Sequence, residues 1–484
     1  MTILNRAALA GLAPARRPLV DPRDLQPRIV HFGLGAFHRA HQAVYTEAAA
    51  ARTGEPWGIV AVAPRSSVAP MRAQDCLYSV TDVAPGAGAT RVIGAVVEAL
   101  NMRADAVRLT ELLRSSHITT VTLTVTEKGY SRRPDGGLDT AAPGVGDDLA
   151  ATAATDPDLV TVVGRLCAGL AARFRAGGAP VDVVSCDNTA GNGAALARVL
   201  REFVEASAWS DRDPVLDWLG TSVGFPDTIV DRIVPATTSA DRDGAEAALG
   251  VRDEMAVVGE PYRQWVLQDA FVAARPRWEI DGALVVPDVA PYQLMKLRLL
   301  NGSHSAMAYL GAAAGCTTVA DVLATEWGEP LVRAFGAEVA PTLPTESDSG
   351  GGLDAGRYVD DLVARFRNPA MQHLLRQIGS DGSLKIPERW FPALRDLRAA
   401  SAATPVLELA LAGWVSATQP GATHGMTDPA TAALNRCWTD TSDPKALVGA
   451  LLRTVGADDL AEQADLTASV AARLPALRAG QIDL

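Results

Sequence analysis

A glycine turn between a short apolar segment and a helical segment is the feature that most restricts the fold of this chain. Residues 28–31 are expected to form a buried strand, and Gly33 and Gly35 follow directly. Such a turn leads a strand straight into a helix, and its backbone N–H groups can approach a pyrophosphate. We therefore expect a dinucleotide-binding turn, formed by Phe32, Gly33, Leu34, Gly35, Ala36, Phe37, His38 and Arg39.

The turn departs from the full Gly-x-Gly-x-x-Gly pattern, because His38 occupies the third glycine position. A bare Gly-x-Gly pair is also found in ordinary tight turns. The strand before the turn and the helix after it favour the nucleotide-binding interpretation. His38, Arg39 and His41 could help to neutralise phosphate groups; alternatively, they form a solvated helix start.

Strand-like and helix-like segments alternate after this turn, which favours a largely parallel sheet with helical crossovers. We predict an α/β chain with a Rossmann-type domain over residues 1–286 and a mainly helical domain over residues 287–484, where Ala and Leu dominate. Residues 281–291 separate the two with three chain breakers, and residues 347–352 form the clearest flexible loop. Expected strands are residues 57–63, 118–126 and 181–185, and expected helices are residues 158–176, 192–206 and a segment from the glycine turn through about residue 51.

Charge and cysteine content exclude several classes of function. A net charge of −12 over 484 residues argues against nucleic acid or an anionic membrane as the main partner. The five cysteines are scattered, which fits neither a zinc site nor a disulfide framework, so we expect no metal and reduced thiols. No continuous apolar run resembles a signal peptide or a membrane span, and we expect a cytoplasmic protein.

The end of the second expected strand bears on the choice between NAD and NADP. An acidic residue at this point would hold the ribose hydroxyls of NAD, whereas an arginine could accommodate the additional phosphate of NADP. The residues here are Ala63-Pro64-Arg65-Ser66-Ser67, without an acid. Arg65 is therefore a candidate cofactor-binding residue, and the local sequence leaves NADP open.

A second segment gathers three polar side chains within nine residues of apolar, helix-forming sequence, namely Lys296, Asn301 and His304. On one α-helix, His304 would lie roughly 80° and Asn301 roughly 140° around from Lys296, although Gly302 could bend the segment. A lysine in an apolar setting can lose its proton near neutral pH and act as a base. Neutral donors beside it can stabilise a developing oxyanion, so the segment is a candidate for hydride-transfer chemistry without a metal.

Ordinary structural roles compete with this interpretation. A Lys-x-Arg pair is usually a solvated helix face, and Asn-Gly is usually a turn. A single histidine among Ala and Leu is more often a hydrogen-bonded core residue than a catalytic group.

Ordered motifs along the chain resemble the polyol-specific long-chain dehydrogenases, the family of mannitol 2-dehydrogenase and fructuronate reductase (mannonate oxidoreductase). Five motifs in order are far more specific than any one alone. They are the glycine turn with its helix start; Thr126-Glu127-Lys128-Gly129-Tyr130; Cys186-Asp187-Asn188-Thr189-Ala190-Gly191-Asn192-Gly193; Phe225-Pro226-Asp227-Thr228-Ile229-Val230-Asp231-Arg232-Ile233; and Lys296-Leu297-Arg298-Leu299-Leu300-Asn301-Gly302-Ser303-His304. Two further segments, Arg365-Phe366-Arg367-Asn368-Pro369 and Asp381-Gly382-Ser383-Leu384-Lys385, are also similar to the family.

The resemblance implies an active site between a Rossmann-type domain and a helical domain, NAD as cofactor, no metal, and a monomer. It implies that Lys296 is the base, that Asn188 and Asn301 stabilise the oxyanion, and that His304 binds substrate. Asp227 would contact sugar hydroxyls, and Arg376 and Lys385 are candidates for the distal end of the substrate. Family members commonly carry Glu three residues before the base, where this chain has Gln293, which puts proton escape by that route in doubt.

Lys128 bears on the subgroup, because mannitol dehydrogenases tend to have Gly at its position. A cationic side chain would suit a carboxylate-bearing substrate, so the resemblance favours a fructuronate reductase-like enzyme that acts at C2 of an open-chain sugar acid or polyol. The alternative at this position is a surface lysine after a strand. Mannitol or arabinitol 2-dehydrogenation is the alternative activity, and a non-catalytic dinucleotide-sensing protein is the alternative from another class.

Overall fold

The chain forms two compact units, Met1–Val289 and Ala290–Leu484, so the division lies three residues after the one expected. The structure is a computed structural model, and it describes residues 2–84, 88–125, 127–154, 158–344, 353–369, 373–422 and 425–484. The loop expected at residues 347–352 lies outside the described residues.

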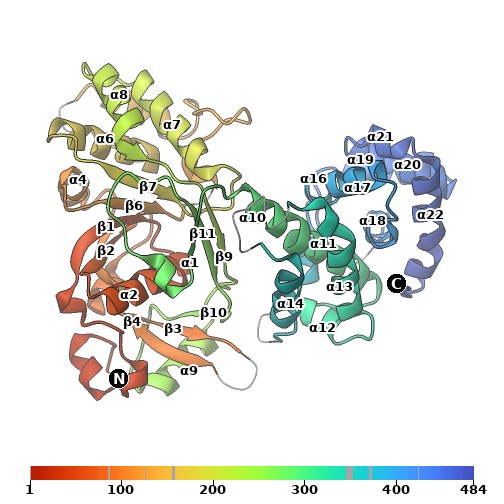
Figure 1. Ribbon diagram of the computed structural model, residues 1–484, viewed down its shortest axis with the longest axis horizontal. Helices are drawn as coiled ribbons and strands as arrows, with labels where there is room; N and C mark the ends of the chain where they lie inside the picture. Colours follow the sequence, from red (N-terminus) through yellow and green to blue (C-terminus); the bar gives the residue numbers. More distant parts are fainter. Residues whose placement is uncertain are drawn as a thin grey trace. The chain divides into compact units, whose positions relative to one another are not determined.

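A six-stranded sheet forms the centre of the N-terminal unit, and every neighbouring pair in it is parallel. Its order is β5-β2-β1-β6-β7-β8, which is the doubly wound 3-2-1-4-5-6 arrangement of dinucleotide-binding folds. The order reverses between β1 and β6, which lie side by side in Figure 1. The strands are β1 (Gln26–Phe32), β2 (Trp57–Ala63), β5 (Val96–Asn101), β6 (Thr120–Leu123), β7 (Val181–Ser185) and β8 (Val223–Gly224).

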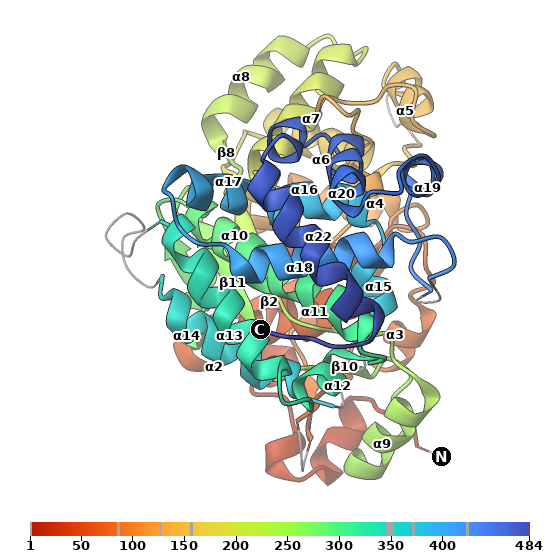
Figure 2. The same cartoon turned by 90° about the vertical axis from the view of Figure 1, so that its right-hand side faces the viewer.

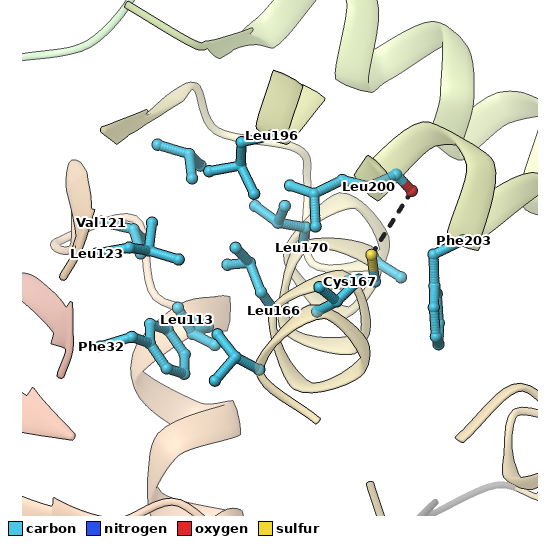
Figure 3. Packing of buried hydrophobic residues seen from close by; sticks show 14 of the residues in the cluster. Phe32, Leu113, Val121, Leu123, Leu166, Cys167, Leu170, Leu196, Leu200 and Phe203 are labelled. Atoms are coloured by element: carbon cyan, nitrogen blue, oxygen red, sulfur yellow. Dashed lines mark hydrogen bonds between the residues drawn. The ribbon is translucent and has the colours of Figure 1, made fainter. Parts of the chain in front are cut away.

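Both faces of this sheet are covered, which explains why its strands are continuous apolar runs. One face packs against α4 (Ala106–Arg114), α6 (Val162–Arg175) and α7 (Asn192–Ala206). Figure 3 shows Phe32, Val121 and Leu123 of the sheet facing leucines of these helices. The Cys167 thiol is buried in this cluster and donates to the Leu200 carbonyl, and all five cysteines are free thiols.

The opposite face packs against α2 (Gln42–Thr53) and against two three-stranded sheets. The first contains β10 (Val257–Gly259), β3 (Tyr78–Asp82) and β4 (Ala89–Ile93), and the second contains β12 (Leu284–Val286), β11 (Gln264–Gln268) and β9 (Thr228–Asp231). The remaining helices of this unit are α1 (Ala36–Ala40), α3 (Ala69–Ala73), α5 (Val145–Ala151), α8 (Arg212–Ser222) and α9 (Ser239–Leu249).

The C-terminal unit is built of helices around α11 (Gly302–Ala313) and α18 (Pro405–Ala417), which pack against each other. Figure 2 shows α18 beside α22 (Ala464–Arg478). The other helices are α10 (Ala290–Met295), α12 (Val319–Leu323), α13 (Gly328–Val339), α14 (Ala355–Phe366), α15 (Leu375–Gly379), α16 (Gly382–Arg389), α17 (Phe391–Ala399), α19 (Thr431–Asp440), α20 (Pro444–Thr454) and α21 (Asp458–Ala461). The predicted α/β class, with a Rossmann-type domain followed by a helical one, is confirmed.

The expected elements form; β2, β7 and α7 have the expected ends, and others differ. The strand expected at residues 118–126 is only β6 (Thr120–Leu123), and the helix expected from residue 158 begins at Val162. The helix expected after the glycine turn is broken at His41, whose backbone leaves the helical region with φ −122° and ψ −87°. Among the described residues, no helix is long and apolar enough to cross a membrane.

Asp182 in β7 gives the N-terminal unit a pH-dependent stability. Its buried carboxylate accepts the N–H groups of Val272 at 2.8 Å and Ala273 at 3.1 Å. Burial raises the pKa of Asp182 to about 6, against an ordinary value of 3.8. Because the folded-state pKa is raised, the stabilisation is present at pH below the ordinary value and is lost as the pH rises through 6.

We predict that raising the pH from 4.5 to 7 lowers the free energy of unfolding of the wild type by about 2 kcal/mol more than that of Asp182→Asn. Hydrogen exchange of peptides covering residues 181–186, in a urea series at both pH values, measures this difference. Equal pH dependence in the wild type and the variant would contradict the raised pKa.

Candidate functional site

The carboxyl ends of the parallel strands collect four of the segments singled out in the sequence. The glycine turn follows β1, Arg65 follows β2, the Lys128 turn follows β6 and Asn188 follows β7. Ligands bind at this edge in open α/β sheets, at the point where the strand order reverses. The turn after β1 lies at that point, between β1 and β6.

The glycine turn is held in a conformation that requires glycine at Gly33. Its φ is +118°, and a Cβ there would lie 2.6 Å from Thr124 Oγ1. The imidazole of His31 donates from Nε2 to the Gly33 carbonyl at 3.0 Å, so its Nδ1 accepts from the Thr122 hydroxyl at 2.7 Å. At Gly35, by contrast, a Cβ would meet nothing within 4 Å, so there is open space in front of the turn.

His38, Arg39 and His41 are buried, which rules out the alternative of a solvated helix start. The His38 ring stacks on His31 with 3.4 Å between ring centroids, and burial lowers the pKa of His38 well below its ordinary value. Burial likewise lowers the pKa of His41 to about 3, and its Nε2 contacts the Gln264 carbonyl. Both imidazoles are neutral at physiological pH, so they carry no positive charge toward a phosphate.

Arg39 is also directed into the N-terminal unit, where its guanidinium donates to the Met255 carbonyl. The Tyr78 hydroxyl donates to the Arg39 carbonyl at 2.9 Å. Arg39 therefore supports the turn from within the unit instead of extending into solvent.

Asn188 lies exposed at the end of β7, on a loop that is held by buried hydrogen bonds. The Asn192 amide donates to the carbonyls of Asp187 at 3.0 Å and Thr228 at 3.1 Å, and its oxygen accepts from Thr228 N–H at 2.9 Å. Ser185 Oγ donates to the Asp187 carboxylate at 3.0 Å. The Asn188 loop is thus fixed on both sides of the side chain that the sequence identified.

Tyr130 connects this loop to the turn after β6. Its hydroxyl donates to Ser185 Oγ at 2.8 Å, because the single proton of that serine is already directed at Asp187. Burial raises the pKa of Tyr130 well above its ordinary value, so the phenol keeps its proton. The side chain of Lys128, in the same turn, lies outside the part of the chain that the structure describes.

Asp227 and Arg65 occupy different surroundings at this edge. The Asp227 carboxylate accepts N–H groups from Gly193 at 2.7 Å and Ala194 at 3.2 Å, and so caps the first turn of α7. This contact gives Asp227 a structural role that the sequence did not indicate. Arg65 is exposed in the turn after β2.

Lys296 and Asn301 are the first and last residues of a π-helical segment between α10 and α11, which we call the π-turn (Lys296–Asn301). In an α-helix, residues five apart lie roughly 140° from each other, whereas i→i+5 hydrogen bonding brings them closer to one line along the helix. His304 follows Asn301 by three residues in α11, a spacing that makes neighbours on a helix surface. The π-turn therefore places Lys296, Asn301 and His304 closer to one line along the helix than a regular α-helix would. We call these three residues the row.

The surroundings of this row come from α13, from the end of α14 and from His373, which precedes α15. His304 packs against Phe366 at the end of α14, with 4.6 Å between ring centroids, and against His373 at 5.6 Å. Gly302 does not bend the segment: its φ of −63° and ψ of −51° are helical. A Cβ at Gly302 would lie 2.9 Å from the Phe335 ring, so this glycine permits close packing against α13.

Lys385 and Arg389 lie four residues apart on α16, and Arg389 was not identified from the sequence. Arg389 donates to the Asn301 carbonyl at 3.3 Å and to Ser305 Oγ at 2.8 Å. Lys385 is half-buried, donates to the Ile378 carbonyl at 3.2 Å, and has its pKa lowered by burial and by the charge of Arg389. Arg376 on α15 is exposed.

Within the described ranges, no group of three or more His, Cys, Asp or Glu side chains is placed to hold a metal ion.

Comparison with known proteins identifies the family. A model described as the mannitol dehydrogenase Rossmann domain matches residues 27–280, and one described as the mannitol dehydrogenase C-terminal domain matches residues 288–478. The chain is 36% identical over 475 residues to the D-mannonate oxidoreductase of Escherichia coli (strain K12), covering 95% of each protein. It is also 36% identical over 475 residues to the mannitol 2-dehydrogenase of Cereibacter sphaeroides, covering 95% of this chain and 96% of the relative.

A solved structure agrees with these matches. The ternary complex of Pseudomonas fluorescens mannitol 2-dehydrogenase with NAD and D-mannitol has 33% sequence identity and a TM-score of 0.76, covering 98% of this chain and 96% of that one. The chain belongs to the mannitol dehydrogenase family, and it is an oxidoreductase. The resemblance found in the sequence motifs is thereby confirmed.

Close packing at Gly302 gives a stability prediction for this site. Gly302→Ala places a methyl group against Phe335, and overpacking typically costs about 1–3 kcal/mol. Gly220→Ala in α8 is the matched control, because the nearest atom to its Cβ is 3.5 Å away and alanine favours a helix. We expect thermal unfolding to show a lower Tm for Gly302→Ala and a higher Tm for Gly220→Ala, and recovery in Gly302→Ala/Phe335→Leu. A Gly302→Ala variant as stable as Gly220→Ala would rule out the close contact.

Proposed function

We propose that this protein is an NAD-dependent oxidoreductase that interconverts a secondary alcohol and a ketone at C2 of an open-chain sugar acid. Mannonate and fructuronate are the proposed pair, with Lys296 as general base and no metal; the reacting carbon is C2 in fructuronate, which is the same atom as C5 of mannonate. The observation that carries it is the row of Lys296, Asn301 and His304 on the π-turn and α11. NADP is a possible second cofactor, because the end of β2 carries Arg65 and no acid.

The glycine turn fits a dinucleotide. A Cβ at Gly35 would meet no atom within 4 Å, so a ligand has room to approach the turn there, and glycine at position 33 avoids a clash with Thr124. Residues 32–37 would hold the pyrophosphate, and Arg65 would face the adenosine ribose. When bound, NAD supplies the acceptor for the hydride.

The residues of the chain handle the proton and the oxygen. In oxidation, neutral Lys296 accepts the C2 hydroxyl proton and becomes an ammonium, while the hydride leaves C2 with its electron pair and C2–O becomes a double bond. The amides of Asn188 and Asn301 donate to the oxygen as negative charge develops on it. His304 and Asp227 are assigned to substrate hydroxyls, and Gln293 cannot take up the proton as a carboxylate would.

Lysine usage supports this assignment. Only four of the 44 lysine and arginine residues are lysines: Lys128, Lys296, Lys385 and Lys445. Arginine, which cannot be deprotonated in a protein, supplies the other 40 of these positive charges. Three of the four lysines, Lys128, Lys296 and Lys385, lie in the segments that resemble the family, whereas Lys445 is exposed at the start of α20.

A sugar acid is favoured over a neutral polyol by the proposed cations Lys128, Lys385 and Arg376. The half-buried position of Lys385 supports this, because an ammonium that is partly removed from water gains from a carboxylate partner. Mannitol or arabinitol oxidation is the alternative within the family. A non-catalytic dinucleotide sensor is the alternative from another class; the presence of Lys296, Asn301 and His304 weighs against it, since a sensor needs no base.

We predict that Lys296→Ala lowers kcat by roughly 10²–10⁴-fold with an unchanged Kd for NAD, because the variant loses the proton acceptor and keeps the glycine turn. Steady-state assays on mannonate and mannitol, with NAD affinity from the quenching of tryptophan fluorescence, measure both values. Near wild-type kcat would reject the base assignment. Binding of NAD without turnover by the wild type, on a wide panel of polyols and ketoses, would favour the sensor.

Substrate charge gives a separate prediction for Lys385→Met and Lys128→Met. Hydrogen bonds to charged groups contribute about 1.5–3 kcal/mol, so losing one should lower kcat/KM on mannonate roughly 10- to 150-fold and on mannitol much less. Lys445→Met, on the exposed start of α20, is the control and should alter neither. Equal losses on both substrates would assign these lysines to folding or cofactor placement, and a wild type that prefers mannitol would favour the polyol alternative.

A further inference from the structure

We propose that Arg389 and Trp390, at the junction of α16 and α17, are positioning residues that hold the π-turn in register and thereby align Lys296 with Asn301. The inference rests on the proposed function, in which the side chains of Lys296 and Asn301 act on the same substrate oxygen. Neither Arg389 nor Trp390 contacts the substrate in this proposal.

Side chains from outside the helix donate hydrogen bonds where the π-turn ends. The Asn301 and Gly302 carbonyls lie where the i→i+5 pattern gives way to i→i+4 bonding, so contacts to them act on the position of that change. Arg389 donates to the Asn301 carbonyl at 3.3 Å, and Trp390 Nε1 donates to the next carbonyl, Gly302, at 3.0 Å. Two consecutive carbonyls at the end of the π-turn are thus held by donors from outside the helix.

The same junction also contacts α11 beyond the π-turn. Arg389 donates to Ser305 Oγ at 2.8 Å, one turn after Asn301. Trp390 is fully buried, and its ring lies 3.7 Å from a Cβ placed on Gly302. Arg389 therefore connects both sides of the point at which the helix changes its hydrogen-bond pattern.

Other residues fix the remaining side of the π-turn. Arg298 donates to the Thr342 carbonyl and forms an ion pair with Asp396 at 2.9 Å. Ser303 Oγ donates back to the Leu299 carbonyl at 2.5 Å. A π-turn is less regular than the α-helix that the same residues could form, so these contacts select it.

Loss of the Arg389 contact lets the segment relax toward regular α-helical bonding, which rotates Lys296 away from the row that contains Asn301. A misplacement of about 1 Å can lower the rate by on the order of 100-fold. The affinity for NAD should not change, because the dinucleotide turn belongs to the other unit. The effect should therefore fall on the chemical step.

The experiment is a single-turnover measurement of mannonate oxidation by the enzyme with saturating NAD. The rate constant of NADH formation reports alignment, and the amplitude reports the fraction of active enzyme. We expect Arg389→Met to lower the rate constant about 10- to 100-fold at unchanged amplitude, Arg389→Lys to lower it less, and Trp390→Phe to lower it as well. Arg395→Met, which removes a guanidinium of α17 paired with Asp459 at 2.7 Å, is the matched control and should leave the rate constant unchanged.

A second readout does not depend on turnover. After reductive [¹³C]methylation, the four lysines give few NMR signals, and Lys296→Arg identifies that of Lys296. We expect Arg389→Met to shift the Lys296 signal and to leave those of Lys128 and Lys445 in place. An unmoved Lys296 signal, or an amplitude that falls while the rate constant stays constant, would overturn the positioning role. If the wild type were inactive on every substrate while Arg389→Met still shifted the Lys296 signal, the proposed reaction would be rejected and the positioning role of Arg389 would stand.

Discussion

Parallel pairing of the strands in the central sheet determines where this chain can bind a ligand. All six strands end at the same edge, and the connections that leave them must turn there into helices. The order reverses between β1 and β6, so their connections diverge and leave space in front of the Gly33–Gly35 turn. Buried hydrogen bonds from His31, Asn192 and Tyr130 then fix the loops at this edge.

The helical unit depends on a local departure from regular structure. A continuous α-helix from α10 to α11 would separate Lys296 and Asn301 by roughly 140° around its axis. The π-turn brings them toward one line, and contacts from Arg298, Arg389 and Trp390 hold it. Irregular backbone at functional residues, maintained by the surrounding packing, is a recurring feature of active sites.

The sequence predicted the elements whose signal is local. β2, β7 and α7 begin and end where expected, because apolar runs and helical periodicity identify them directly. The break at His41 depends on the Gln264 carbonyl, more than 200 residues away in the chain, which no local pattern reports. Long separation also hides the pairing of β3 with β10, although β3 pairs locally with β4. At the candidate site, Lys296, Asn301 and His304 were proposed from their spacing and from the family resemblance, whereas Arg389 was not, because no sequence pattern reports its contact with Asn301.

Hydride transfer from C2, without a metal, is the central claim, and isotope transfer tests it most directly. Enzyme freed of metals with a chelator is incubated with NAD and D-mannonate that carries deuterium at C5, the carbon that becomes the C2 ketone of fructuronate. The account predicts fructuronate as product and one deuterium on C4 of the reduced nicotinamide, detected by mass spectrometry. Loss of the deuterium to solvent, its retention in the sugar acid, or transfer that requires an added metal ion would contradict the account.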